Sequence, residues 1–182
     1  GAILVYLAGK TGRFLPEDVR GRFRVLEWLM FQMGGVGPMF GQLGFFHAYK
    51  GREIEDKRPL DRYVAESRRL LGVLDRQLDG REWITGEYSI ADIAIAPWVN
   101  TLAQGYKAGE LLGLDEFVRV GAWVERFLAR PAVQRGMLVA GVVLVGLLLL
   151  TALLAPLLAP YGFADTAADG EAFGTQRPPS AA

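Results

Sequence analysis

The stretch at residues 87–97, EYSIADIAIAP, constrains the fold of this chain more than any other segment. Ser89 is followed three residues later by Asp92, which fits a capping box that satisfies two backbone amides at the start of a helix. Tyr88 before the box and Ile93 after it can close as a hydrophobic staple. The residues that follow are almost wholly apolar, as in a helix buried on every side. We therefore expect a central helix on which the other helices pack.

Helical patterns also occupy the first forty residues. Residues 1–11 are apolar and end at Gly12, and residues 17–33 carry too many large apolar side chains for one narrow stripe. Pro38 lacks an amide hydrogen and is expected to kink this second helix. The glycines of the preceding GGVG run have two interpretations, either close packing between helices or the wall of a ligand cleft. Close packing is the favoured interpretation.

The middle of the chain continues the helical pattern. Residues 59–78 place apolar side chains at helical spacing, and their charged residues fit a solvated face. The helix of the capping box is expected to run to about Lys107. Asp115 is expected to cap a further helix, and residues 131–137 to form a last short turn. The sequence thus predicts an all-α bundle of about five to six helices, followed by one long hydrophobic helix.

Composition excludes several kinds of site. Lysine and arginine total 20 and so do aspartate and glutamate, so no nucleic-acid footprint is visible. The absence of cysteine excludes disulfides, a thiol nucleophile and zinc–thiolate centres. The single histidine, His47, excludes a histidine-rich metal cluster, and we interpret it as a surface or partly packed residue rather than a catalytic base. We expect no metal site.

A hydrophobic segment at residues 138–158, LVAGVVLVGLLLLTALLAPLL, is long enough to span a bilayer, which takes about 20 residues. A buried core helix is the alternative, but valine and leucine lie on every face. Charged residues flank the segment, basic before it and acidic after it: Arg126, Arg130, Arg135, Asp165, Asp169 and Glu171. The positive-inside rule then places the preceding domain in the cytoplasm, anchored at the inner membrane. We expect a transmembrane helix over residues 138–160 and a polar, disordered tail over 161–182.

Five motifs within residues 1–137 resemble the C-terminal half of a bacterial glutathione transferase, most closely the Nu-class, disulfide-bond reductase type. They are GAILVYLAGKTGRFLP, WLMFQMGGVGPMFGQ, DRYVAESRRLLGVLDRQL, YSIADIAIAPWV and ARPAVQRGM. The capping box is typical of all glutathione transferases, whereas QMGGVGPMFGQ is more specific to this subgroup. The resemblance implies a glutathione-transferase C-terminal helical domain over residues 1–137.

The same resemblance implies a function and a set of site residues. Members of the family bind glutathione, as co-substrate, mainly through an N-terminal thioredoxin-like domain, which we expect to be absent here, so we assign no catalytic residue. Arg62 in the DRY motif matches an arginine that reaches glutathione, with a surface ion pair as the alternative. Phe45, Phe46 and Trp98 would line the pocket of a small electrophile or disulfide, unless they are core residues. Family members are homodimers.

Residues 138–182 carry a second resemblance, through LLLLTALLAPLLAPYGFADT and the FGTQRPPSA tail. They are similar to the first membrane span of a dipeptide or oligopeptide ABC-transporter permease. Two alternatives to a transferase half follow: a permease component of a peptide transporter, and a non-catalytic, membrane-anchored helical module. The junction at residues 134–137 is either a natural fusion or an artefact of assembly or gene prediction that joined two reading frames, and the lack of a polar spacer favours the second interpretation.

Overall fold

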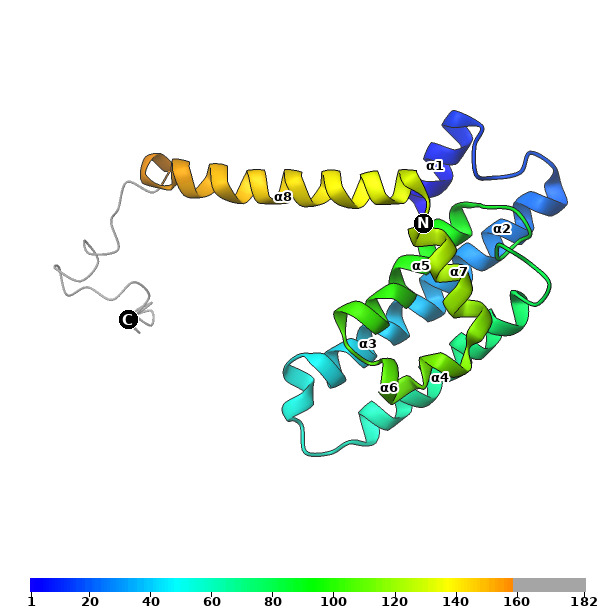
Figure 1. Ribbon diagram of the computed structural model, residues 1–182, viewed down its shortest axis with the longest axis horizontal. Coiled ribbons are helices and arrows are strands. Elements are labelled where there is room, and N and C mark those ends of the chain that lie inside the picture. The colour runs from blue at the N-terminus through cyan, green and yellow to red at the C-terminus, as the bar shows by residue number, and fades with distance from the viewer. Residues whose placement is uncertain (159–182) are drawn as a thin grey trace, which may run out of the picture. The chain divides into compact units, whose positions relative to one another are not determined.

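The computed structural model describes residues 1–158, and this part of the chain contains helices and no strand. It divides into two compact units, one over residues 1–130 and one that begins at Pro131. The α-helices are α1 (Ala2–Thr11), α2 (Val19–Phe31), α3 (Gly37–Ala48), α4 (Arg58–Gln77), α5 (Ile90–Asn100), α6 (Gly109–Leu112), α7 (Val118–Leu128) and α8 (Pro131–Leu158) (Figure 1). Short π turns span Gln32–Val36 and Thr101–Gly105, and 3-10 turns span Lys50–Glu53 and Leu114–Glu116.

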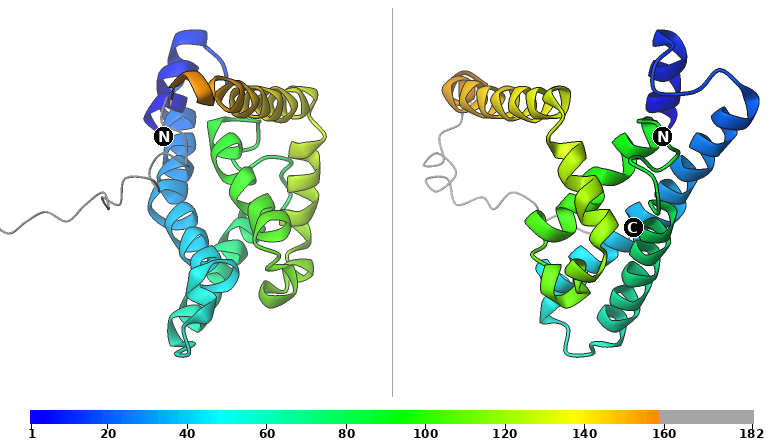
Figure 2. Two further views of the ribbon diagram at one scale, coloured as in Figure 1. Left: turned by 90° about the vertical axis from the view of Figure 1, so that its left-hand side faces the viewer. Right: turned by 45° about the vertical axis from the view of Figure 1, so that its right-hand side comes forward.

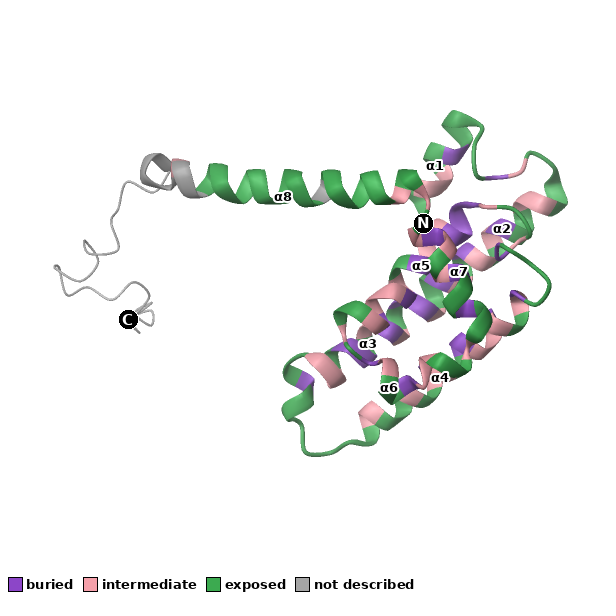
Figure 3. Ribbon diagram, viewed as in Figure 1, coloured by how far each residue is buried: buried purple, intermediate pink, exposed green. Residues whose placement is uncertain are grey.

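Helix α5 is the centre of the first unit. It packs against α1, α2, α3 and α7, and Figure 2 shows it between α2 and α7. Most of its apolar residues are buried, among them Ile90 and Ile95, but Pro97 is exposed and Ile93 is only partly covered (Figure 3). The expected helix is therefore present, and burial on every side was wrong at these positions. Through the π turn that follows, the helical path continues to Gly105, close to the expected end at Lys107.

Helices α2 and α3 form one continuous helical run through the π turn Gln32–Val36. The amide of Gly37 donates to the carbonyl of Gln32, five residues back, so the turn is wider just before Pro38. A π turn accommodates a proline that would otherwise clash with the preceding turn. A Cβ on Gly37 would lie 2.9 Å from Nε2 of Gln32, and one on Gly44 would overlap the ring of Tyr106. Within the GGVG run, a Cβ on Gly35 would lie 3.4 Å from Leu70 of α4 and one on Gly37 3.6 Å from Trp98 of α5, whereas nothing lies within 4 Å of one on Gly34. Close packing between helices therefore holds at Gly35 and Gly37 and not at Gly34.

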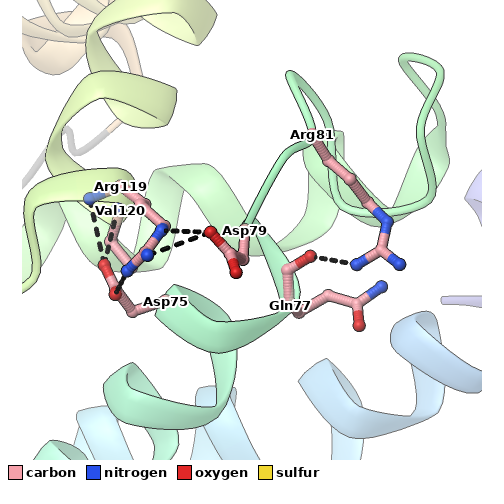
Figure 4. A network of polar contacts seen from close by, with 6 residues as sticks. All are labelled: Asp75, Gln77, Asp79, Arg81, Arg119 and Val120. Atoms are coloured by element: carbon pink, nitrogen blue, oxygen red, sulfur yellow. Dashed lines mark hydrogen bonds and ion pairs between the residues drawn. The ribbon is translucent and has the colours of Figure 1, made fainter.

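Helix α7 is capped from another helix. Oδ1 of Asp75 on α4 accepts from the amides of Arg119 and Val120 at 3.0 and 3.3 Å (Figure 4). The Arg119 guanidinium also pairs with Asp75 and Asp79, at 2.9 Å in each case. Asp115 lies in the 3-10 turn before the helix begins, so the prediction that it caps α7 was wrong. The cap comes from a residue more than forty positions earlier, which no local motif indicates.

Helix α8 begins at Pro131 and is continuous for 28 residues. The predicted short turn at residues 131–137, followed by a separate helix from 138, was therefore wrong, because a proline suits the first turn of a helix and nothing after it interrupts the helix. Every residue from 136 to 151 whose burial is described is exposed. Residues 131–151 are also long and apolar enough to cross a membrane. The predicted tail, residues 161–182, lies outside the described residues.

Candidate functional site

Arg62 lies near the start of α4 and is exposed. Within residues 1–158 it forms no ion pair, because the carboxylate one turn away, Glu66, pairs with Arg69 at 2.7 Å instead. Hydrogen bonds from Arg69 are the main reason that the pKa of Glu66 lies below its usual value, and the charge of Arg62 adds a smaller contribution. The Arg62 guanidinium is thus accessible to an anionic group from solution.

Phe45 and Phe46 lie in the last turn of α3, close to Tyr63 near the start of α4. Their rings meet edge to face with centroids 5.1 Å apart, and Phe46 stacks on Tyr63 at 5.6 Å with an interplanar angle of 17°. Tyr63 directly follows Arg62, so the cation and the aromatic rings come from adjoining positions on α3 and α4. Phe45 is 43 % exposed, which leaves part of its ring available to an apolar ligand.

Trp98 on α5 packs against α3 at another point. Its ring lies 3.6 Å from the position of a Cβ on Gly37 and 3.9 Å from that of a Cβ on Gly41. Gly41 is one helical turn before Phe45, so Trp98 and Phe45 lie along the same side of α3. Within the described residues no stacking contact joins Trp98 to either phenylalanine. The structure therefore brings Phe45 and Phe46 together and places Trp98 one turn away, partly as a packing residue. Arg62 is next to Tyr63 in the chain, but within the described residues no contact joins it to these rings, so its place in the same site stays a prediction.

A pocket with a volume of about 540 Å³ lies elsewhere, between the loop that joins α1 to α2 and the segment just before α5. Three carboxylates and one guanidinium line it: Glu17, Asp18, Glu87 and Arg24. Phe14, also in its wall, has a positive φ of 65°, which is uncommon for a residue with a side chain. The pocket walls come from residues 12–25 and 85–89, which are far apart in the sequence, so no local motif indicates the pocket.

Asp92 is the buried polar centre of the first unit. It completes the capping box by accepting from the Ser89 amide at 2.9 Å, while Oγ of Ser89 accepts from the Ala91 amide at 3.2 Å. Oδ1 of Asp92 accepts from the Ile84 amide at 3.1 Å and from Nε1 of Trp123 at 2.9 Å. Burial raises the pKa of the Asp92 carboxyl, and these hydrogen bonds act in the opposite direction. The box therefore also ties α5 to the preceding segment and to α7.

Comparison with known proteins identifies the family. The family model described as glutathione S-transferase, C-terminal domain, matches residues 38–131, which is more than half of the chain. The chain belongs to the glutathione S-transferase family. Its all-α bundle is the C-terminal fold of that family, and the matched range runs from α3 to the first residue of α8.

The relatives of this transferase chain include two curated proteins of Escherichia coli. The disulfide-bond oxidoreductase YfcG is 42 % identical over 141 residues, which is 77 % of this chain and 62 % of YfcG. The disulfide-bond oxidoreductase YghU is 40 % identical over 142 residues, which is 76 % of this chain and 49 % of YghU. The matched part of the chain therefore spans 49 to 62 % of the length of these relatives.

Solved structures of transferases resemble the chain even more in sequence. A family member from Pseudomonas fluorescens, with two glutathione molecules bound, is 60 % identical with a TM-score of 0.73, over 74 % of this chain and 60 % of that one. A transferase from Pseudomonas putida, with one glutathione disulfide bound per subunit, is 61 % identical with a TM-score of 0.73, over 74 % and 59 %. The family match does not extend over residues 138–182, so their resemblance to a permease stays a prediction.

Proposed function

We propose that the first unit is the substrate-binding, helical half of a glutathione-dependent transferase or disulfide reductase. The support is the identity of 60–61 % to two structures that contain glutathione or its disulfide, together with two relatives named as disulfide-bond oxidoreductases. Its co-substrate would be glutathione, and its second substrate a disulfide or a small electrophile.

Arg62 is the residue that we propose for glutathione binding. A guanidinium presents several N–H donors in a plane, which suits a carboxylate such as those of glutathione. Its exposure and its lack of an ion pair within residues 1–158 agree with this role. Phe45 and Phe46 would then cover the apolar part of the second substrate, with Trp98 behind them.

The chemistry would be attack by the glutathione thiolate on a disulfide sulfur or an electrophilic carbon. This step requires a thiol whose pKa is lowered by nearby donors. In the family that activation belongs to a thioredoxin-like domain, so the helical half contributes binding and orientation of the two reactants.

The proposal is tested with a fusion. The residues that precede the matched region in the Pseudomonas fluorescens relative are joined to Gly1, and glutathione-dependent reduction of a model disulfide is measured. We expect turnover, and a rise in the KM for glutathione in the Arg62→Ala variant. The Arg76→Ala variant, on the exposed face of the same helix, is the control and should match the parent. A fusion that folds and binds glutathione but reduces no disulfide and conjugates no electrophile would contradict the proposal.

We further propose that α8 anchors this domain in a membrane. The helix is apolar, uncharged after Arg135 and exposed wherever its burial is described between residues 136 and 151. Its 28 residues correspond to ~42 Å of helix, more than the ~30 Å hydrocarbon layer. Because the basic residues lie before it, the transferase unit would face the cytoplasm at the inner membrane. The permease alternative rests on this same helix, which an anchored domain explains without transport.

A homodimer is the remaining proposal that follows from the family. Light scattering of the detergent-solubilised full chain gives its mass directly, and a particle that contains one chain at all micromolar concentrations would contradict a stable dimer.

A further inference from the structure

Three arginines and three aromatic rings form one series of contacts in the first unit, in which Trp83 is buried and Phe14 is exposed. We call this set the arginine–aromatic ladder, and in order of contact it contains Arg126, Trp83, Arg130, Tyr88, Phe14 and Arg13. The Arg130 guanidinium lies 3.6 Å from the Tyr88 ring centroid and 5.3 Å from that of Trp83. Arg126 lies 5.8 Å from the Trp83 centroid, and Arg13 lies 4.9 Å from that of Phe14. Cation–π contacts of this kind fix a guanidinium by its face.

The edges of these guanidinium groups retain donors. Within residues 1–158 none of the three arginines forms an ion pair. Arg126 donates to the backbone carbonyl of Glu82 at 2.8 Å, and Nε of Arg130 is buried without a hydrogen-bond partner. Because this Nε is buried, the terminal NH2 groups of the partly exposed Arg130 are the donors that remain for an anion. A guanidinium held by its face presents its N–H edge to an oxyanion, and phosphate oxygens fit that edge best.

The position of the ladder along the chain indicates where the phosphate comes from. Arg130 is the residue directly before α8, and the last charge before the apolar run is Arg135. Arg130 itself precedes the helix, and the five residues Pro131 to Arg135 rise ~7.5 Å along its axis before Gly136. The headgroup layer on each side of a bilayer is ~5–7 Å thick, and arginine side chains extend several Å to reach it. If α8 spans a membrane, Arg130 therefore lies at the depth of the lipid phosphates.

We propose that the arginine–aromatic ladder binds the phosphate of an anionic phospholipid at the cytoplasmic surface. This inference depends on the proposed insertion of α8, and it adds a lipid-binding site in the transferase unit itself. The aromatic rings fix the guanidinium groups, and the headgroup phosphate accepts hydrogen bonds from their edges. A preference for anionic over neutral membranes follows.

The experiment is vesicle flotation of the full chain. One set of vesicles contains phosphatidylcholine alone, and the other contains phosphatidylcholine with phosphatidylglycerol. Binding to neutral vesicles reports insertion of α8, and the anionic-to-neutral binding ratio reports the ladder. Changing Arg13, Arg126 and Arg130 to glutamine should lower that ratio at least ~tenfold, because each basic residue near an anionic surface contributes separately. Neutral binding should not change.

Two matched variants separate this site from general surface charge. Glutamine at Arg20, Arg52 and Arg76 removes the same charge from exposed positions outside the ladder and should leave the ratio within about twofold of the parent. Lysine at the three ladder positions keeps the charge but removes the planar fork, and should lower the ratio severalfold. Circular dichroism confirms that each variant is folded.

Several results would overturn the inference. Equal losses in the ladder and control variants would show that only net charge matters, and full binding by the lysine variant would show that the stacked guanidinium groups do not matter. Loss of the anionic preference in millimolar inorganic phosphate at constant ionic strength would show that the site takes free phosphate. If the chain does not bind neutral vesicles but keeps a ladder-dependent preference for anionic ones, only the insertion of α8 is contradicted. If it binds neither kind of vesicle, both proposals are contradicted.

Discussion

Asp92 shows how one buried carboxylate can define a fold at the scale of a residue. Its two oxygens accept from two amides, a hydroxyl and an indole, contributed by the segment before α5, by the box itself and by α7. Ser89 and Asp92 were visible as a box because they are three residues apart. The hydrogen bond from Trp123 could not be predicted in the same way, since a contact across 31 positions leaves no local pattern.

Ionisation of Asp92 should make the free energy of unfolding depend on pH. The ordinary pKa of an aspartate, which applies to the unfolded chain, is 3.8, and burial raises the pKa of Asp92 in the folded chain. Between these two pKa values the folded chain binds more protons than the unfolded chain. Stability contributed by this group is therefore complete below 3.8 and falls as the pH rises through that window. Urea unfolding of the parent and of Asp92→Asn, from acid to neutral pH, checks this. The difference in unfolding free energy should shift in favour of the parent as the pH falls, and a shift in the opposite direction would contradict it.

A second prediction concerns the cap of α7. Asp75→Ala removes the acceptor of two amides at the start of this helix and should cost about 0.5–2 kcal/mol of stability. Asp79→Ala removes only an exposed partner of Arg119 and should cost less. Asp115→Ala, at the position that the sequence favoured, should have almost no effect. Urea unfolding of the three variants ranks them, and a larger loss at Asp115 than at Asp75 would reverse the structural assignment.

At the scale of the helices, α3 depends on close approach. Gly44→Ala would drive a Cβ into the Tyr106 ring and should destabilise the domain by about 1–3 kcal/mol. Gly9→Ala in α1 is a suitable control, because no atom lies within 4 Å of the added Cβ and a helical alanine is favourable by about 0.5–1 kcal/mol. Thermal unfolding should shift in opposite directions for the two variants. Equal shifts would show that the Gly44–Tyr106 contact is easily relieved.

Helix α8 provides a test that leaves the transferase unit unchanged. Arginine at Leu148, well inside the apolar run, should weaken membrane insertion by about 2.5–3.5 kcal/mol. Flotation with neutral vesicles measures the loss, and near-ultraviolet circular dichroism reports the packing of the helical domain. Arginine at Gln134, among the polar residues before the run, is the control. If both variants float like the parent, the apolar run does not enter the bilayer.

The sequence predicts the ends of a helix well when the residues that end or cap it are close in the chain, and poorly when they are far apart. Gly12 ends α1 in a left-handed conformation, and Pro131 begins α8, both through local geometry. The ladder and the Asp75 cap join segments that are tens of residues apart, so periodicity could not reveal them. The sequence indicated Arg62, Phe45 and Phe46 as candidate site residues, but not the stacking of Phe46 on Tyr63.

At the scale of the whole chain, the division at residue 130 makes a prediction about folding. A truncated chain that ends at Arg130 should fold with the full set of buried core residues, because α8 belongs to the second compact unit. Urea unfolding of this truncation should be a single cooperative transition. The full chain in detergent should unfold in its first unit at nearly the same denaturant concentration. A truncation that lacks a cooperative transition would show that α8 contributes to the core.

The π turn between α2 and α3 has a consequence for how this segment can change over evolutionary time. Its wider turn holds one residue more than a regular turn would, directly before Pro38. Deletion of a single residue there would rotate everything that follows by about 100° around the helix axis. Gly44 and Phe45 would then point in other directions, away from their present contacts with Tyr106 and Phe46. The length of this segment is therefore fixed by every contact that α3 makes.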